Sequence, residues 1–83
     1  MNSIDKYKFE FEMEIVSSMD YLKYLYKTMS PDLEREKGDP RSHIELRDDS
    51  LYIYIASNSQ SKFVGIINTI VRLATVLDKL YRK

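Results

Sequence analysis

The first part of the chain alternates between large apolar side chains and charged ones. Apolar or aromatic residues occupy the odd positions from 7 to 15, and lysine or glutamate occupies the even positions between them. A period of two that includes aromatic residues is typical of a strand with one buried face. We therefore predict a strand over residues 7–15. Its inward residues are Tyr7, Phe9, Phe11, Met13 and Ile15, and its outward residues are Lys8, Glu10, Glu12 and Glu14.

A helical pattern follows the first strand. Ser17 and Ser18 offer N-caps, and Asp20 suits the positive end of a helix dipole. Because the residue before a proline avoids the α region, Ser30-Pro31 is predicted to end this helix at about Met29. Its apolar stripe consists of Met19, Leu22, Tyr26 and Met29, widened by Tyr21 and Leu25.

The second half of the chain reads as a hairpin and a long helix. A polar loop over 34–40 precedes strands at 42–47 and 51–56, which a turn at 48–50 joins. The third strand is apolar on both faces, with Leu51, Ile53 and Ile55 in one row and Tyr52, Tyr54 and Ala56 in the other. Either both faces are covered, or the tyrosine row is an exposed contact surface.

The final helix, predicted over 62–81, is wider in its apolar face than one sheet requires. Its apolar residues span an arc of roughly 200°, whereas a helix on one sheet needs about 100°. These residues are Phe63, Ile66, Ile67, Ile70, Val71, Leu73, Ala74, Leu77, Leu80 and Tyr81. The order β-α-β-β-α predicts an α+β fold, a three-stranded antiparallel sheet with two helices packed on one face.

Composition narrows the function. The 83 residues allow one domain, 1–83, with little surplus stability, so that burial against a partner would help. Lys+Arg and Asp+Glu are 13 each, which argues against a dedicated nucleic-acid binder. Because the chain has no cysteine and one histidine, metal sites built from thiolates or from several histidines are excluded. We expect no cofactor, no membrane span and no signal peptide at Met1–Lys6, and hence a cytoplasmic location.

Polar groups give no catalytic pattern, and each has an ordinary interpretation. His43 is predicted to be a solvent-facing strand residue, since no serine or cysteine nucleophile is spaced to use it. The glutamate row is either a solvated face or a site for a cation or basic partner. The basic residues Lys23, Lys27, Lys79, Arg82 and Lys83 either compensate helix dipoles or touch phosphates. We therefore predict that the protein is not an enzyme.

Four short motifs stand out along the chain: Phe9-Glu10-Phe11, Met29-Ser30-Pro31-Asp32, the predicted strand Leu51–Ala56 and Asn68-Thr69-Ile70-Val71-Arg72. With these motifs, roughly residues 9–80 resemble the Pcc subunit of the KEOPS complex, which makes threonylcarbamoyladenosine on transfer RNA. The family usually has an aspartate where Ser59 stands and an arginine where Val64 stands, so a diverged paralogue is an alternative to the standard subunit.

The resemblance implies a non-catalytic assembly subunit. Such a subunit dimerises through its sheet and packs its two helices on two helices of the Kae transferase subunit. The expected partner-binding residues are Met19, Leu22, Tyr26, Met29, Ile66, Ile70, Leu73, Leu77, Asn68 and Arg72, with Leu73 at the outer edge. The expected dimer residues are Phe9, Phe11, Tyr52 and Tyr54.

Asn68 and Arg72 are expected at the rim of the transferase contact, or else as a solvated pair. The second copy is either identical or a paralogue, and transfer RNA contact is expected only within the complex. Two other functions stay open from the sequence: a small RNA-binding module, and an enzyme with an unrecognised site. An RNA-binding sheet face would be basic and aromatic, whereas the first strand here is acidic.

Overall fold

The computed structural model describes residues 7–34 and 38–81 and gives the predicted order of elements. The elements are β1 (Phe9–Val16), α1 (Met19–Leu33), β2 (Arg41–Leu46), β3 (Ser50–Ser57) and α2 (Gln60–Tyr81). The start Met1–Lys6, the middle of the predicted loop (35–37), and Arg82 and Lys83 lie outside the described residues.

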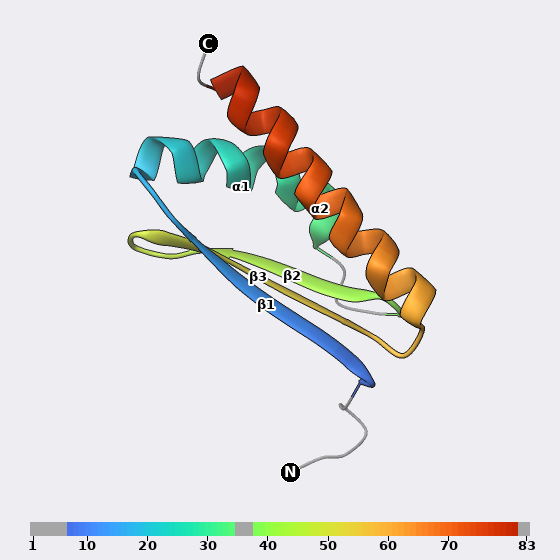
Figure 1. The fold of residues 1–83 in the computed structure, drawn as a ribbon. Coiled ribbons are helices and arrows are strands. Elements are labelled where there is room, and N and C mark those ends of the chain that lie inside the picture. Colours follow the sequence, from blue (N-terminus) through green and yellow to red (C-terminus); the bar gives the residue numbers. More distant parts are fainter. Residues whose placement is uncertain (1–6, 35–37, 82–83) are drawn as a thin grey trace.

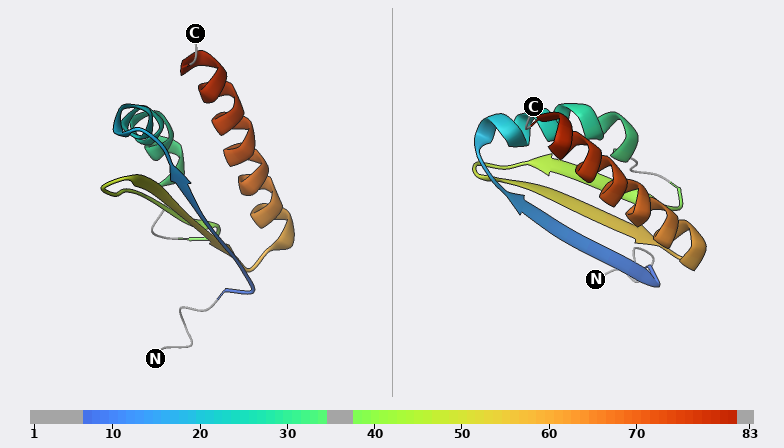
Figure 2. Two further views of the ribbon diagram at one scale, coloured as in Figure 1. Left: turned by 60° about the vertical axis from the view of Figure 1, so that its left-hand side comes forward. Right: turned by 45° about the horizontal axis from the view of Figure 1, so that its top comes forward.

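The three strands form one antiparallel sheet in the order β1-β3-β2, and both helices lie on the same face of it (Figures 1 and 2). Because β3 is central, it pairs with both neighbours: Glu12 of β1 and His43 of β2 both lie opposite Tyr54. The predicted α+β fold is therefore confirmed. One sheet face packs under the helices, and the other is the outer face.

The core lies between β3 and the two helices. The apolar residues that are 6% exposed or less come from α1 (Leu22, Leu25, Met29, Leu33), from β2 and β3 (Ile44, Leu51, Ile53, Ile55, Ala56) and from α2 (Ile70, Leu77). The row Leu51, Ile53 and Ile55 faces the helices, which explains why β3 is the most apolar strand. The alternation read from β1 is retained, with every second side chain half-buried.

The first helix runs further than its proline suggests. The prediction that Ser30-Pro31 ends α1 is wrong, since the helix continues to Leu33. A proline inside a helix removes the hydrogen bond of its own N–H and crowds the carbonyl four residues before it, so Pro31 works against this last turn. The extra turn buries Leu33, which is 1% exposed, and the Glu34 N–H donates to the Ser30 carbonyl at 3.0 Å. The Ser42 hydroxyl donates to the Leu33 carbonyl. Burial of one leucine and two hydrogen bonds thus outweigh the proline.

Tyr7 departs from the predicted alternation because it precedes the strand. The Arg41 guanidinium lies 5.9 Å from the centre of the Tyr7 ring, and Arg41 lies opposite Ala56, in the row of Tyr52 and Tyr54 that forms the outer face. The prediction that Tyr7 points inward with Phe9 is therefore wrong. Strand pairing begins only at Phe9, so no ladder fixes the direction of the Tyr7 side chain.

Candidate interaction surfaces

The second helix exposes more apolar surface than any other element. Its exposed large apolar side chains are Val64 (46%), Val71 (57%), Val76 (47%), Leu80 (57%) and Tyr81 (44%). At about 100° per residue, Val64 and Val71 lie on one flank of the buried Ile70 and Leu77, and Val76 and Leu80 lie on the other. We call the first pair the outer ridge and the second pair the inner ridge.

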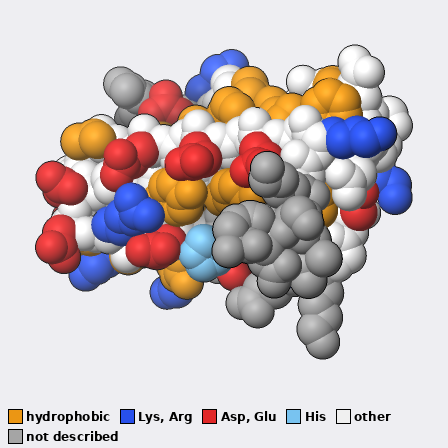
Figure 3. Space-filling view, turned by 90° about the horizontal axis from the view of Figure 1, so that it is seen from below, with side chains coloured by type: hydrophobic (Ala, Val, Ile, Leu, Met, Phe, Trp, Pro, Cys, Tyr) orange, Lys and Arg blue, Asp and Glu red, His pale blue; other side chains and the backbone are white. Residues whose placement is uncertain are grey.

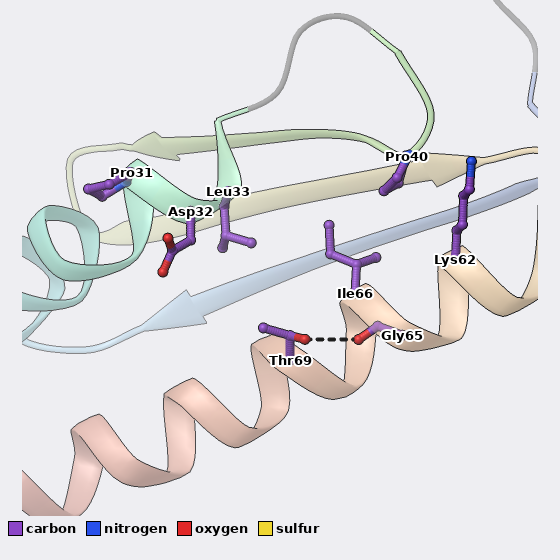
Figure 4. Close-up of a pocket in the computed structure, with 8 residues that line it drawn as sticks. All are labelled: Pro31, Asp32, Leu33, Pro40, Lys62, Gly65, Ile66 and Thr69. Carbon is purple, nitrogen blue, oxygen red and sulfur yellow. Dashed lines mark hydrogen bonds between the residues drawn. The ribbon is translucent and has the colours of Figure 1, made fainter.

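A hollow separates the end of α1 from the start of α2 (Figure 4). Its volume is about 470 Å³, and it is lined by Pro31, Asp32, Leu33, Pro40, Lys62, Gly65, Ile66 and Thr69. A Cβ added at Gly65 would meet nothing within 4 Å, so the chain itself gives no steric reason for a glycine there. By helical geometry, Gly65 and Thr69 share a flank with the inner ridge. The hollow and this ridge therefore form one strip along α2.

The far ends of the two helices meet through aromatic side chains. The Tyr81 ring lies 4.8 Å from that of Tyr21 and 5.4 Å from that of Tyr24, measured between centroids. The Tyr21 hydroxyl also donates to Asp78 at 3.0 Å. The helices are therefore in contact at one end and separated by the hollow at the other.

The residues predicted to bind a partner divide by burial. Leu22, Met29, Ile70 and Leu77 belong to the core, so a partner cannot touch them without opening the fold. Met19, Tyr26, Ile66 and Leu73 are half-buried, and only Asn68 and Arg72 are fully on the surface. The expectation that Leu73 forms the outer edge of α2 is wrong, because Leu73 packs against the core.

The residues expected to line one groove between the helices lie in two different hollows. Ile66 lines the hollow beside α2. Tyr26 instead lines a second hollow with Pro31, His43 and Leu46, over the β2 side of the sheet. The surface residues that the sequence reasoning missed are Val64 and Val76, which lie outside the predicted arc, and Val71 and Leu80, which lie within it. A helical wheel gives the width of an arc, but it does not say which part of the arc meets the sheet.

The outer face of the sheet carries hydrophobic side chains between charged ones (Figure 3), and Tyr52 and Tyr54 lie in this face opposite Glu14 and Glu12. The Arg47 guanidinium lies 4.2 Å from the centre of the Tyr52 ring, and its nitrogens lie 3.2 Å from Glu45 and 3.6 Å from Glu14. The Tyr54 hydroxyl donates to Glu10 at 3.1 Å. Burial first and the Glu10 carboxylate second raise the pKa of Tyr54 to about 12, so this hydroxyl keeps its proton.

The residues expected to form a dimer lie on opposite faces of the sheet. Phe11 is opposite Ile55 in the ladder and packs against the core, and Phe9 stacks on Phe63 of α2 at 5.6 Å. Tyr52 and Tyr54 lie opposite the outward Glu14 and Glu12. The four residues therefore do not form one contact surface.

His43 links α1 to the hairpin. Its Nδ1 lies 3.0 Å from Glu34, just past the end of α1, and its Nε2 lies 3.3 Å from Glu45 on its own strand. The hydrogen bond with Glu34 raises the pKa of His43 above its usual 6.5, burial opposes this, and Glu45 adds to it. Its side chain is 42% exposed. These contacts tie α1 to β2.

Over 7–34 and 38–81, no three histidine, aspartate or glutamate side chains are placed to hold a metal ion. In the same ranges, no helix is long and apolar enough to cross a bilayer.

Comparisons of the chain with family models, with curated proteins and with solved structures found no match.

Proposed function

We propose that this protein is a non-catalytic assembly subunit that holds a helical segment of a larger protein against α2. The observation that carries the proposal is the exposed apolar surface of α2, with a ridge on each flank of its buried seam. Scattered apolar residues need no explanation, but five on one helix, two of them on the flank that carries the hollow, are the pattern of a contact surface.

The hollow strip is the part of this surface that suits a helix best. A glycine in the middle of a helix costs about 1 kcal/mol relative to alanine, and here it relieves no contact within the chain. Gly65 and Thr69 would let another backbone approach closely, while Val76 and Leu80 would extend the contact along α2. Ridges of one helix packing into such a groove are the ordinary mode of helix association.

The partner that the sequence resemblance suggests is the Kae transferase subunit of the KEOPS complex. In this proposal the chain supports threonylcarbamoyladenosine formation on transfer RNA by assembly alone. Of the residues first expected at this contact, Ile66, Asn68 and Arg72 stay in the proposal, and Val76 and Leu80 join them. Dimerisation, with an identical copy or with a paralogue, stays a prediction that sedimentation of the isolated chain will test.

Co-purification with the Kae subunit tests the proposal. Leu80→Asp and Gly65→Leu are expected to abolish capture, because the first puts a charge into an apolar contact and the second fills the hollow. Both positions are exposed, so circular dichroism and the urea midpoint should change little.

Lys23→Glu is the matched control, since Lys23 is exposed on α1, away from the α2 ridges. Its capture should equal that of the unmodified chain. If the unmodified chain fails to capture the Kae subunit, the KEOPS assignment is wrong. If Leu80→Asp and Gly65→Leu bind as well as Lys23→Glu does, the surface assignment is wrong.

A further inference from the structure

The two edge strands of the sheet, β2 and β1, differ in what lies beside their outer sides. At the β2 edge, the Ile44 N–H donates to the Glu34 carboxylate at 3.2 Å, and the Ser42 hydroxyl donates to the Leu33 carbonyl. The end of α1 thus occupies that edge with polar groups. At the β1 edge, no described helix or strand lies beside the strand, as Figure 2 shows. In a two-stranded antiparallel pairing, every second residue of β1 turns its N–H and C=O away from β3.

The outward row of β1 is a set of ordered carboxylates. Ser50 donates to Glu14 at 2.6 Å and Tyr54 donates to Glu10 at 3.1 Å. Burial raises the pKa of Tyr52 most, and Tyr52 lies close enough to Glu12 for this carboxylate to raise it further. Each glutamate therefore reaches the β3 residue two positions before its partner in the ladder. The carboxylates repeat at about 7 Å, the spacing of alternate side chains on a strand.

The inward row of β1 is only partly covered. Phe11, Met13 and Ile15 are half-buried, whereas Ile53 and Ile55, beside them on the same face of the central strand, are fully buried. A strand added beside β1 would cover part of the surface that these three residues leave exposed. Within the part of the chain that the structure describes, the β1 edge therefore combines unpaired backbone groups, a partly exposed apolar row and an ordered acidic row.

From these three features we propose that the free edge of β1 receives a strand from a different protein, in which Lys or Arg alternates with apolar residues. Neighbouring strands keep like faces together, so the basic side chains would meet Glu10, Glu12 and Glu14. The apolar side chains would cover Phe11, Met13 and Ile15. Backbone hydrogen bonds would supply affinity and the alternating side chains would supply specificity, as in other cases of strand addition.

A second copy of this chain does not fit the edge. Two β1 strands side by side in register would bring one glutamate row against the other, and like charges directly opposite destabilise a sheet. A basic strand reverses that repulsion. The outer face already binds one cation in this way, because Arg47 stacks on Tyr52 between Glu14 and Glu45.

This surface is distinct from the α2 ridges. The helices lie over the face of the sheet that carries Phe11, Met13 and Ile15, but the free edge of β1 belongs to neither helix (Figure 1). The proposal therefore does not rest on the KEOPS assignment, and its failure would leave that assignment standing.

The test uses the whole chain and a synthetic peptide of the length of β1 in which arginine alternates with valine. Two control peptides accompany it. One carries glutamate in place of arginine, and the other keeps the arginines but has every second backbone nitrogen methylated, on the edge that would pair with β1. Binding is measured by fluorescence anisotropy, and amide hydrogen exchange locates the contact.

We expect the arginine peptide to bind at least about tenfold more tightly than either control, since charge and strand pairing both contribute. Alternate amides of β1 should become protected from exchange. In a Glu10→Lys/Glu12→Lys variant the preference should reverse, with the glutamate peptide binding more tightly, and that reversal would also show that the variant is folded.

Equal binding of the methylated and unmethylated arginine peptides would overturn the proposal, because the attraction would then be charge alone. Protection confined to β2 or to α2 would also overturn it, since the strand would then have added elsewhere. A chain that self-associates with protection of β1 would assign the edge to a second copy instead.

Discussion

The two helices lie on the same face of one sheet, yet they use their apolar residues differently. The shorter helix, α1, has 15 residues and buries four of them, Leu22, Leu25, Met29 and Leu33. The longer helix, α2, has 22 residues and buries only Ile70 and Leu77. All five exposed large apolar side chains of the helices belong to α2. The difference teaches that apolar content and burial are separate quantities in this fold.

Position on the sheet explains the contrast. The α1 helix packs on the core along its length, from Leu22 to Leu33, and its end is joined to β2 through Glu34 and Ser42. The α2 helix rests on the core at Ile70 and Leu77 and touches its neighbours near its ends, through Phe63 and Tyr81. Stability that α2 does not obtain within the chain is available from a partner.

The largest test of this comparison is an alanine substitution in each helix. Leu25→Ala in α1 should lower the free energy of unfolding by about 2–5 kcal/mol, because Leu25 is 1% exposed and its removal leaves a cavity. Val71→Ala in α2 should change it by about 0.5 kcal/mol or less, since Val71 is 57% exposed. Urea unfolding measures both, and equal losses would refute the comparison.

The next largest difference in unfolding free energy is expected from removing two hydroxyl groups, one bonded to each helix. The Ser42 hydroxyl is buried and donates to the last residue of α1, so Ser42→Ala should cost about 1–3 kcal/mol by leaving the Leu33 carbonyl unsatisfied. The Thr75 hydroxyl is exposed and donates to the Val71 carbonyl of its own helix at 2.8 Å. Thr75→Ala should therefore be nearly neutral, because alanine favours the helix more. A larger loss at Thr75 than at Ser42 in the same urea experiment would contradict this.

The contact between the helices gives a smaller effect. Tyr21→Phe removes the hydrogen bond to Asp78 but keeps the ring, so we expect a loss of about 0.5–1.5 kcal/mol. Tyr24→Phe is the control, since the Tyr24 ring stacks on Tyr81 and no hydroxyl bond accompanies it in the described structure. Thermal unfolding of the two variants should differ in this order, and identical melting temperatures would show that the Asp78 bond adds nothing.

The smallest effect concerns the junction of α1 with β2 and depends on pH. The pKa of His43 is raised above 6.5 in the folded chain, so protonation stabilises the fold. That contribution is fully present below about pH 6.5 and is lost as the pH rises through the folded pKa of His43. His43→Gln should flatten the decline in the unfolding free energy across this range. A decline that persists unchanged in His43→Gln would assign it to other groups.

The elements of the fold were predictable from the sequence, and their ends and contacts were less so. Strict alternation in β1 and the three- and four-residue spacing of the helices are local signals, and the five elements follow from them. The predicted end of α1 at about Met29 was wrong because tertiary packing buries Leu33, and local rules about Pro31 do not include tertiary packing. Tyr7 was misplaced because the pairing with β3 stops at Phe9.

The candidate surfaces were harder to predict because they depend on how the elements are rotated against each other. The arc of α2 is wider than the sheet requires, as predicted, but position along the helix also decides burial: Leu73 packs against the core, whereas Leu80, seven residues later on the same side of the helix, is exposed. Phe11 and Tyr54 were grouped as one surface, whereas the ladder puts Phe11 opposite Ile55 and Tyr54 opposite Glu12. Only the strand register, which the sequence pattern does not give, separates those two faces.

The sheet order β1-β3-β2 also has a consequence while the chain is being synthesised on the ribosome. The first strand to be made pairs with β3 alone, and Phe9 finds its partner only when Ser57 has been added. The hairpin of β2 and β3 closes locally, whereas β1 must wait for a contact that is distant in sequence. During that wait an aromatic strand lies unpaired in a crowded environment. The three glutamates between its apolar residues then oppose aggregation of the nascent chain with other molecules.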